Sequence, residues 1–429
     1  MKRRLIVFGA VLIVTAFVGS HSLPAQQSSS GSQSQTTTQP PSPPSQTTTA
    51  PAAATGTFQQ SEGPVSIGGE PAVTLTRPRS LDAKKPQFLQ AVVLPGAGMN
   101  LFQLKAYIPG KGDVDLISTA DLATAATLLQ TGDQPGNAGN AALAMGAPFL
   151  VPFAGVIRGR PSPDGKTIST IIDTHRLSLP ANWHGAEPAA VNGLILASKF
   201  QVVSQRNDAN QSTIFAKLHA GSFNGQWPSE TDVTVGLTLK DASLDLYVIA
   251  KNVGGQEDPL GIGLLPYFAI PSGDRKQARL TIPADMRTVV NSHLDDFPTG
   301  RIVSVNGTAY DFTSSAGTAL GNFSIDDYFT DLQHGDDQDK IGGSNNMNEI
   351  VQLIDPAAKY GLRMRILSQH IKTIQVYAPA DKDFIAIGPQ FNLPDPYSRI
   401  WRGQDTGMVA LQPGKSVVWY VRLELFTPR

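Results

Sequence analysis

The chain has 429 residues, and its 34 Lys and Arg against 35 Asp and Glu give a formal net charge of −1 at pH 7. Such a chain lacks the excess of basic side chains that binds a nucleic-acid backbone, which argues against DNA or RNA as a partner. Only 16% of the residues are charged, whereas Gly (40) and Pro (32) are abundant. This composition favours a large β protein over a helical one.

The first residues predict export. Residues 2–4 are Lys, Arg and Arg, and residues 5–19 are an apolar run followed by small residues up to Ala25. The run is short for a membrane span. The pattern predicts a signal peptide over residues 1–25, cleaved after Ala25. The alternative is an uncleaved anchor, which would be the protein's one membrane contact. We expect a periplasmic, secreted or cell-surface protein.

Residues 26–60 are almost entirely Ser, Thr, Gln, Pro and Ala. Such a composition buries too little apolar surface to offset the entropy of ordering, so we predict a disordered spacer. The spacer would hold the folded part away from a membrane or wall, or would be only a flexible leader. The chain has no cysteine, and the folded part must therefore be stable without disulfides.

Residues 65–429 contain no second low-complexity break, and we predict that they form one domain. Residues 232–240 and 244–250 each alternate between apolar and polar positions, with a short turn between them. This alternation predicts a β-hairpin. Further strands are predicted at residues 90–94, 193–203, 301–305, 361–367, 373–377, 384–387 and 416–426.

One helix is predicted, over residues 118–130. Leu122, Ala125 and Leu129 recur at helical spacing, and the Ser118-x-x-Asp121 pattern suits a capping box at its start. Many strands and a single helix predict an all-β fold, either a sandwich or a barrel.

Several segments match landmarks of one known family. Residues 258–271 place glycines in an apolar run that continues Leu265-Pro266-Tyr267-Phe268. This stretch resembles the His-Pro-Tyr-Phe segment of the aldose 1-epimerases, or galactose mutarotases. Further landmarks follow in the family's order at residues 94–100, 146–159, 179–194, 297–300, 307–312, 325–329, 374–377, 385–391 and 411–414. The resemblance implies the galactose mutarotase-like supersandwich.

The resemblance also locates the family's catalytic positions. In that family a Glu takes the proton from the C1 hydroxyl of the sugar and a His protonates the ring oxygen. Here the Glu position holds Gly388 and the His position holds Leu265, and neither side chain can carry a proton. A second His is replaced by Asn192 and an Arg by Val156, while the family's Asp is kept as Asp326. Since each acid or base contributes roughly 10²- to 10⁴-fold in rate, we expect little catalysis.

Neighbouring residues offer replacements. His184 and Asp395 could serve as relocated acid and base, although catalytic geometry tolerates little displacement. The expected sugar contacts are Asp326, Asn192, Arg158, Trp183 and Tyr267. Three of them have a structural alternative: Asp326 could cap a turn, and Trp183 and Tyr267 could belong to the core.

No phosphate-binding loop, zinc motif or nucleophile elbow is present, and we expect no cofactor. The acid-rich residues 331–339 lack the spacing of a calcium loop and are predicted to be a solvated loop. We predict an exported protein that binds a sugar or oligosaccharide with little or no epimerase activity. One alternative is an active aldose 1-epimerase, an isomerase, with relocated groups. The other is a structural envelope protein with a vestigial pocket.

Overall fold

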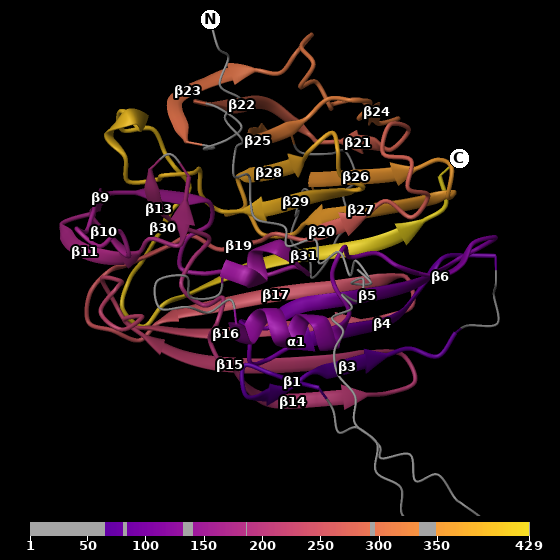
Figure 1. Cartoon of the computed structure of the whole chain (residues 1–429), viewed down its shortest axis with the longest axis horizontal. Helices are drawn as coiled ribbons and strands as arrows, with labels where there is room; N and C mark the ends of the chain where they lie inside the picture. The colour runs from indigo at the N-terminus through magenta and orange to yellow at the C-terminus, as the bar shows by residue number, and fades with distance from the viewer. Residues whose placement is uncertain are drawn as a thin grey trace, which may run out of the picture. The chain divides into compact units, whose positions relative to one another are not determined.

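A computed structural model describes residues 65–79, 84–131, 140–185, 187–291, 297–333 and 349–428, and about half of these residues lie in antiparallel strands (Figure 1). The predicted signal peptide and spacer lie outside the described residues, as do residues 334–339 of the acid-rich stretch. Within the described ranges, no helix is both long enough and apolar enough to cross a membrane.

The larger sheet has nine described strands. In spatial order they are β14 (Gln201–Asn207), β15 (Ser212–Gly221), β16 (Thr231–Leu239), β17 (Ser243–Asn252), β31 (Ser416–Phe426), β27 (Tyr360–Ile366), β26 (Glu349–Asp355), β21 (Arg279–Thr281) and β24 (Thr318–Ala319). The predicted hairpin is confirmed as β16 and β17, which pair from Thr231 with Asn252 to Leu239 with Leu244. Its alternation buries one face of each strand.

The second sheet has eight described strands. In spatial order they are β23 (Pro298–Ser304), β22 (Ala284–Val290), β25 (Ile325–Leu332), β28 (Thr373–Ala378), β29 (Phe384–Gln390), β19 (Gly263–Leu264) and β7 (Phe149–Leu150), while β20 (Tyr267–Ala269) also pairs with β29. Both large sheets contribute to one hydrophobic core, which includes Leu246 of the first and Ile374 of the second. The Trp419 indole N–H donates to the Pro389 carbonyl at 3.1 Å and joins the two sheets. The all-β prediction is confirmed as a β-sandwich.

A four-stranded sheet extends this core near the N-terminal end of the described chain. It consists of β3 (Val73–Thr76), β4 (Gln87–Leu94), β5 (Asn100–Ile108) and β6 (Gly112–Asp115). Leu104 belongs to the main core, whereas Phe102 packs with Leu129 in a separate cluster. One face of this sheet is therefore covered by α1 (Leu122–Thr131) and the 3₁₀ helix η1 (Asn140–Ala144), as Figure 1 shows for α1.

The predicted helix is found, but its predicted start is wrong by about one turn. The Asp121 carboxylate accepts the Thr124 backbone N–H at 2.9 Å and the Thr124 hydroxyl at 2.6 Å, and the helix begins at Leu122. Asp121 is thus the N-cap itself and not the third residue of a box that begins at Ser118.

The predicted strand at residues 193–203 is also wrong over most of its length. Asn192 and Gly193 have φ of 59° and 85°, which turns the chain away from an extended path. A Cβ on Gly193 would lie 2.5 Å from the Val151 carbonyl oxygen, so the close approach requires glycine. Regular pairing resumes only at Gln201. The strands predicted near β4, β23, β27, β28, β29 and β31 are confirmed.

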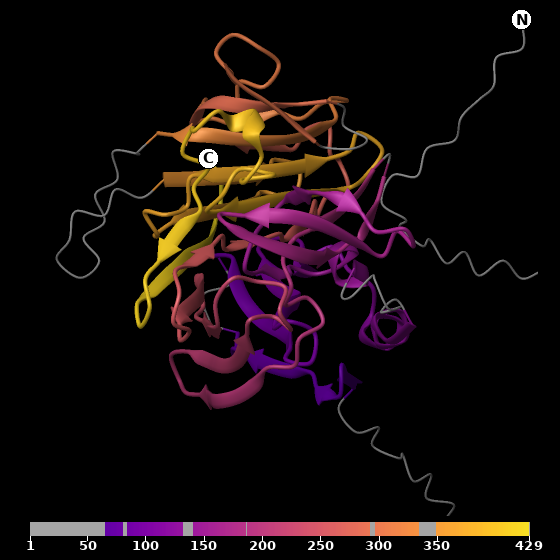
Figure 2. The same ribbon diagram turned by 90° about the vertical axis from the view of Figure 1, so that its left-hand side faces the viewer.

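Short strands gather at one end of the sandwich, which Figure 2 turns toward the viewer. They are β8 (Val156–Arg158), β13 (Pro188–Val191) and β12 (Trp183–His184) in one sheet; β9 (Arg160–Pro161), β10 (Thr167–Ile172) and β11 (His175–Pro180) in another; and the pair β18 (Asp258–Leu260) and β30 (Val409–Leu411). The 3₁₀ helix η2 (Arg399–Trp401) lies beside β23. A further pair, β1 (Ser66–Ile67) and β2 (Glu70–Pro71), begins the described chain.

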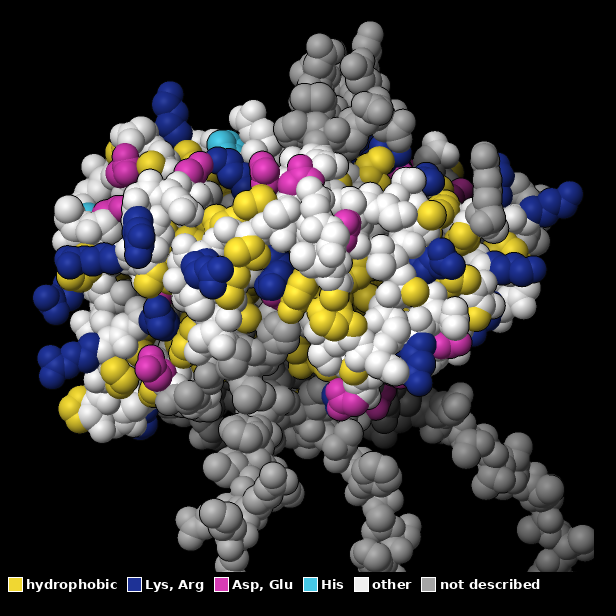
Figure 3. Space-filling view, turned by 90° about the horizontal axis from the view of Figure 1, so that it is seen from above, with side chains coloured by type: hydrophobic (Ala, Val, Ile, Leu, Met, Phe, Trp, Pro, Cys, Tyr) yellow, Lys and Arg dark blue, Asp and Glu magenta, His cyan; other side chains and the backbone are white. Residues whose placement is uncertain are grey.

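Charged side chains of both signs are spread over the face seen in Figure 3, with hydrophobic side chains between them. This distribution is that of a chain with nearly balanced charge.

Candidate functional site

The two positions expected to carry proton-transfer groups lie against each other. Leu265 directly follows β19, and Gly388 lies in β29 beside it. A Cβ built on Gly388 would lie 3.0 Å from Leu265 Cδ1 and 3.2 Å from the Leu264 carbonyl oxygen. Leu265 is buried, with 4% of its surface exposed. An isobutyl group therefore occupies the space next to Gly388, and neither position supplies an acid or a base.

Gln375 lies directly across from Gly388. The two are partners in the β28–β29 pairing, and Tyr328 is the partner of Gln375 on β25. Directly opposed residues of antiparallel strands share a face of the sheet, so these three lie in one row. We call this side of the sheet the Gln375 face.

The Gln375 side chain has an unusual environment. It is 7% exposed, and its buried Oε1 has no hydrogen-bond partner among the described residues. A buried amide oxygen without a partner costs about 1–3 kcal/mol, which a bound hydroxyl or water would recover. Sequence reasoning used residues 374–377 only as a family landmark and missed this side chain. The available signal was one amide within an apolar strand.

A second row of the Gln375 face contains two predicted site residues. Asp326 pairs with Tyr377, Tyr377 pairs with Ala386, and Ala386 pairs with Tyr267, so the structure brings Asp326 and Tyr267 to the same side. Asp326 is the second residue of β25 and so lies within a strand. Its neighbour Asp327 is fully buried and forms an ion pair with Arg287 at 2.6 Å on the opposite side of the strand.

The two tyrosines of this row stay protonated at neutral pH. Burial, with smaller contributions from the Asp326 and Asp381 carboxylates, raises the pKa of Tyr377 to about 12. Burial also raises the pKa of Tyr267, with smaller contributions from Tyr377 and Asp326. Both rings pack against Phe384, with centroid distances of 5.3 Å for Tyr267 and 6.0 Å for Tyr377. They can donate hydrogen bonds, but they are poor bases.

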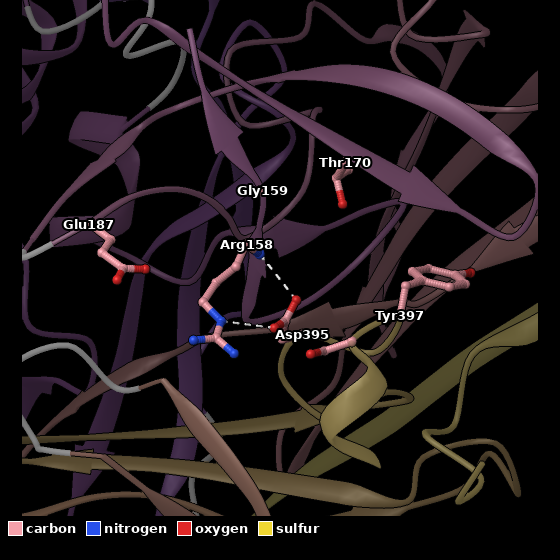
Figure 4. Close-up of a pocket in the computed structure, with 7 residues that line it drawn as sticks. Arg158, Gly159, Thr170, Glu187, Asp395 and Tyr397 are labelled. Carbon is pink, nitrogen blue, oxygen red and sulfur yellow. Dashed lines mark hydrogen bonds and ion pairs between the residues drawn. The ribbon is translucent and has the colours of Figure 1, made fainter. Parts of the chain in front are cut away.

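Arg158 and Asp395, 237 positions apart, meet in a pocket of about 250 Å³. Asp395 Oδ1 accepts the Arg158 backbone N–H at 3.1 Å, and Asp395 Oδ2 accepts Arg158 Nε at 3.0 Å. Figure 4 shows this pair at the centre, with Thr170, Glu187 and Tyr397 around it. The Asp395 side chain is 5% exposed and that of Arg158 is 32% exposed, so the guanidinium extends from a buried carboxylate into the pocket.

The loop that carries Asp395 is fixed from several sides. Asp395 has a left-handed φ of 51°, and its carbonyl accepts the Trp401 indole N–H at 3.0 Å. The Ser398 side chain caps η2 by accepting the Ile400 N–H. On the other side of the pair, the Arg158 guanidinium lies 5.3 Å from the centre of the Phe297 ring. The pocket is therefore built before any ligand arrives.

The structure places Trp183 near this pocket. Trp183 pairs with Ala189, which pairs with Arg158, so the three side chains share one face of the small sheet. Trp183 packs on a cluster that contains Val156 and Phe297, and its buried indole N–H has no described partner. The His184 side chain lies outside what the structure describes.

Asn192 has a different environment from the other predicted contacts. Its side-chain oxygen accepts the Gly155 N–H at 2.9 Å, and its own N–H donates to the Gly155 carbonyl at 2.8 Å. The amide therefore fixes the turn before β8, which positions Val156 and Arg158. The predicted set thus divides into Asp326 and Tyr267 on the Gln375 face, and Arg158, Trp183 and Asp395 at the pocket.

Among the described residues, no group of three or more His, Cys, Asp or Glu could hold a metal ion. What the two places offer is hydrogen bonding: an amide, a carboxylate and two phenols on one, and a guanidinium, carboxylates and hydroxyls at the other. Such groups suit a ligand rich in hydroxyls.

Comparison with known proteins agrees with this fold. A family model for aldose 1-epimerase matches residues 120–424. A galactose mutarotase-like protein from Clostridium acetobutylicum superimposes with a TM-score of 0.60 at 19% identity, covering 79% of this chain and 92% of its own. An aldose epimerase homologue from C. elegans (TM-score 0.58, 15% identity) covers 83% and 99%, and galactose 1-epimerase from Lactobacillus acidophilus (0.55, 14%) also covers 83% and 99%. No curated protein matches the chain.

Proposed function

Because this chain belongs to the aldose 1-epimerase family, we propose that it is an exported protein that binds a carbohydrate and has little or no epimerase activity. The observation that supports this most directly is the contact between Leu265 and Gly388, where the resemblance expects an acid and a base. The proposal separates two properties of the family, the binding of a sugar and the movement of its protons.

Interconversion of anomers requires ring opening, in which one group removes the C1 hydroxyl proton while another protonates the ring oxygen. At the two positions in question the side chains are a hydrogen atom and an isobutyl group. Tyr267 and Tyr377 hold their protons at neutral pH because burial raises the pKa of both. Asp326 then remains as a single carboxylate, which can accept a hydroxyl but cannot also serve as the opposing acid.

The side chains that could bind a sugar, by contrast, are present on the Gln375 face. The Gln375 amide reaches the same side of the sheet as Asp326 and Tyr377 and lacks a described partner for its Oε1. Sugar hydroxyls both donate and accept, so they would satisfy the amide, the carboxylate and the phenol together. The buried Gln375 Oε1, which has no described partner, supports retention of a ligand site.

The alternative of an active epimerase would use Asp395 as a relocated base. Both oxygens of its carboxylate accept hydrogen bonds from Arg158. Each oxygen of this carboxylate therefore already accepts a hydrogen bond within the protein. This pairing supports a binding role over proton transfer.

Export is proposed from the N-terminal sequence alone, in which a basic start precedes an apolar run and a small-residue exit. Cell fractionation and N-terminal sequencing of the mature protein would test it: residue 26 at the N-terminus of an extracytoplasmic protein is the expected result.

The function is tested by two measurements on one preparation. Calorimetric titration with glucose, galactose and their disaccharides should show binding, while polarimetry on fresh α-anomers should give the rate of the protein-free blank. Absence of binding to every sugar would refute the binding role. A rate well above the blank that tracks protein concentration would instead establish the active enzyme.

A further inference from the structure

We propose that the pocket beside Arg158 is a second saccharide subsite, so that the ligand is an oligosaccharide and not a monosaccharide. This inference rests on the proposed function, with one sugar unit on the Gln375 face and the next in the pocket. It is carried by the position of the pocket along β8, by its polar groups and by their charge.

The pocket lies close to Val156, the position at which the family resemblance expects an Arg. Val156, where the resemblance expects an Arg, and Arg158 lie on the same side of β8 because they are two residues apart. Two residues of a strand span about 6.6 Å, which is close to the size of one monosaccharide. The Asp395 N–H donates to the Val156 carbonyl at 2.5 Å, so both ends of this interval are held by the same loop.

The Gln375 face and the pocket approach each other at a single glycine. A Cβ on Gly155 would lie 3.4 Å from the Tyr328 hydroxyl oxygen and 3.4 Å from Pro394 Cα. Tyr328 belongs to the Gln375 face, and Pro394 precedes Asp395 of the pocket. Gly155 adopts a φ of 70° and carries no side chain, so the two places are separated there by little more than its backbone.

The chemistry of the pocket suits a neutral, hydroxyl-rich unit. The terminal nitrogens of Arg158 make no hydrogen bond with a described residue, and the Thr170 hydroxyl and the exposed Glu187 carboxylate add donors and acceptors. Asp395 neutralises Arg158, and Glu187 leaves one negative charge, which disfavours uronates and sugar phosphates. The volume of about 250 Å³ equals roughly eight liquid waters, enough for one sugar ring.

The experiment compares monosaccharides with disaccharides on the full chain. We expect maltose, cellobiose or lactose to bind at least about tenfold more tightly than glucose and galactose. Glu187→Gln and Thr170→Val should each lower the disaccharide affinity severalfold and leave the monosaccharide affinity unchanged. Arg158→Met should remove the disaccharide advantage. Arg160→Met is the matched control, because Arg160 is exposed two residues along the chain and does not line the pocket.

The outcomes separate the two levels of the proposal. If no sugar binds, the proposed function itself fails. If monosaccharides bind and no disaccharide binds more tightly, the second subsite is refuted while the function stands. Arg158→Met removes the partner of a buried carboxylate, so its thermal melt is recorded, and the two milder variants decide the matter if it unfolds. Retention of the full disaccharide advantage in both of them would also overturn the inference.

Discussion

Two regions of this molecule, the surroundings of Leu265 and Gly388 and the pocket at Arg158 and Asp395, differ in the polar groups that they contain. Where the family resemblance expects an acid and a base, Leu265 of an apolar cluster lies beside Gly388, and Gln375 lies directly across from that glycine. At the end of β8, the Asp395 carboxylate accepts one hydrogen bond from the Arg158 guanidinium and one from the Arg158 backbone N–H, and hydroxyl groups line the same pocket. A scaffold can therefore lose its reactive groups while it keeps, a few residues away, the polar groups needed to hold a ligand.

The largest effect is expected when a His and a Glu are introduced at the two positions that lack an acid and a base. The double variant Leu265→His with Gly388→Glu should interconvert glucose or galactose anomers about 10³-fold faster than the unaltered chain, because each proton-transfer group contributes roughly 10²- to 10⁴-fold. Because a Cβ at position 388 would lie 3.2 Å from the Leu264 carbonyl oxygen, a thermal melt of the double variant checks that it folds. Polarimetry measures the rate.

The single variants serve as controls for this gain, and each should fall far short of the pair. A folded double variant that binds sugar yet interconverts it no faster than the unaltered chain would show that more than these two groups has been lost.

Behind the pocket, a buried carboxyl should make stability depend on pH. Asp258 is fully buried, accepts the Thr231 hydroxyl at 2.7 Å, and has its pKa raised to about 6 by burial, from 3.8. Since the folded pKa exceeds the unfolded one, stability should fall as pH rises from about 4 to about 6 and then level off, a loss of about 3 kcal/mol. Asp258→Asn should remove this loss.

Denaturant unfolding at a series of pH values measures the effect. The advantage of Asp258→Asn over the unaltered chain should grow up to about pH 6 and stay constant above it. An equal difference at pH 4 and pH 8 would mean that Asp258 ionises normally in the folded protein.

The ion pair between Arg158 and Asp395 should contribute more to the free energy of unfolding than the exposed Arg160 nearby does. Arg158→Met leaves the buried Asp395 carboxylate without its guanidinium and should cost about 2 kcal/mol in unfolding free energy. Arg158→Met combined with Asp395→Asn should recover most of the loss, since no unpaired charge remains. Arg160→Met should change stability by less than about 0.5 kcal/mol. Urea unfolding of the four proteins checks this, and equal losses for Arg158→Met and Arg160→Met would contradict it.

The smallest expected effect distinguishes a ligand residue from a structural one. Gln375→Leu should weaken sugar binding by about tenfold while leaving stability unchanged or raising it by about 1 kcal/mol, because an unpaired buried amide is removed. Gln352→Leu, which replaces a half-buried glutamine of β26 in the other large sheet, should leave binding unaffected. Calorimetry and thermal melts together measure both effects; a loss of stability with intact binding would assign Gln375 to the core.

The sequence predicted local features better than tertiary ones. Alternation over residues 232–250 was enough for the β16–β17 hairpin, because one face of each strand is buried. The turn at Asn192 and Gly193 was missed, since positive φ there depends on the nearby Val151 backbone. A resemblance located Leu265 and Gly388, but it could not show that the Leu265 side chain lies against Gly388.

The candidate site shows the same division. Arg158 and Asp395 were each singled out from the sequence, yet their pairing is a tertiary contact over 237 positions that no local pattern contains. Gln375 was overlooked because its significance lies in the absence of a described partner for its buried oxygen, which only coordinates reveal. Asn192 was predicted as a sugar contact, and the sequence did not show that its side-chain oxygen also accepts the Gly155 N–H.

The central claim is tested most directly by nuclear magnetic resonance exchange spectroscopy on glucose or galactose. The spectra are recorded with increasing concentrations of the unaltered protein. The account predicts line broadening that shows binding, together with an α–β exchange rate equal to that of the sugar alone. Exchange faster than in the protein-free sample, and abolished by substitution of Asp326 or Asp395, would contradict it.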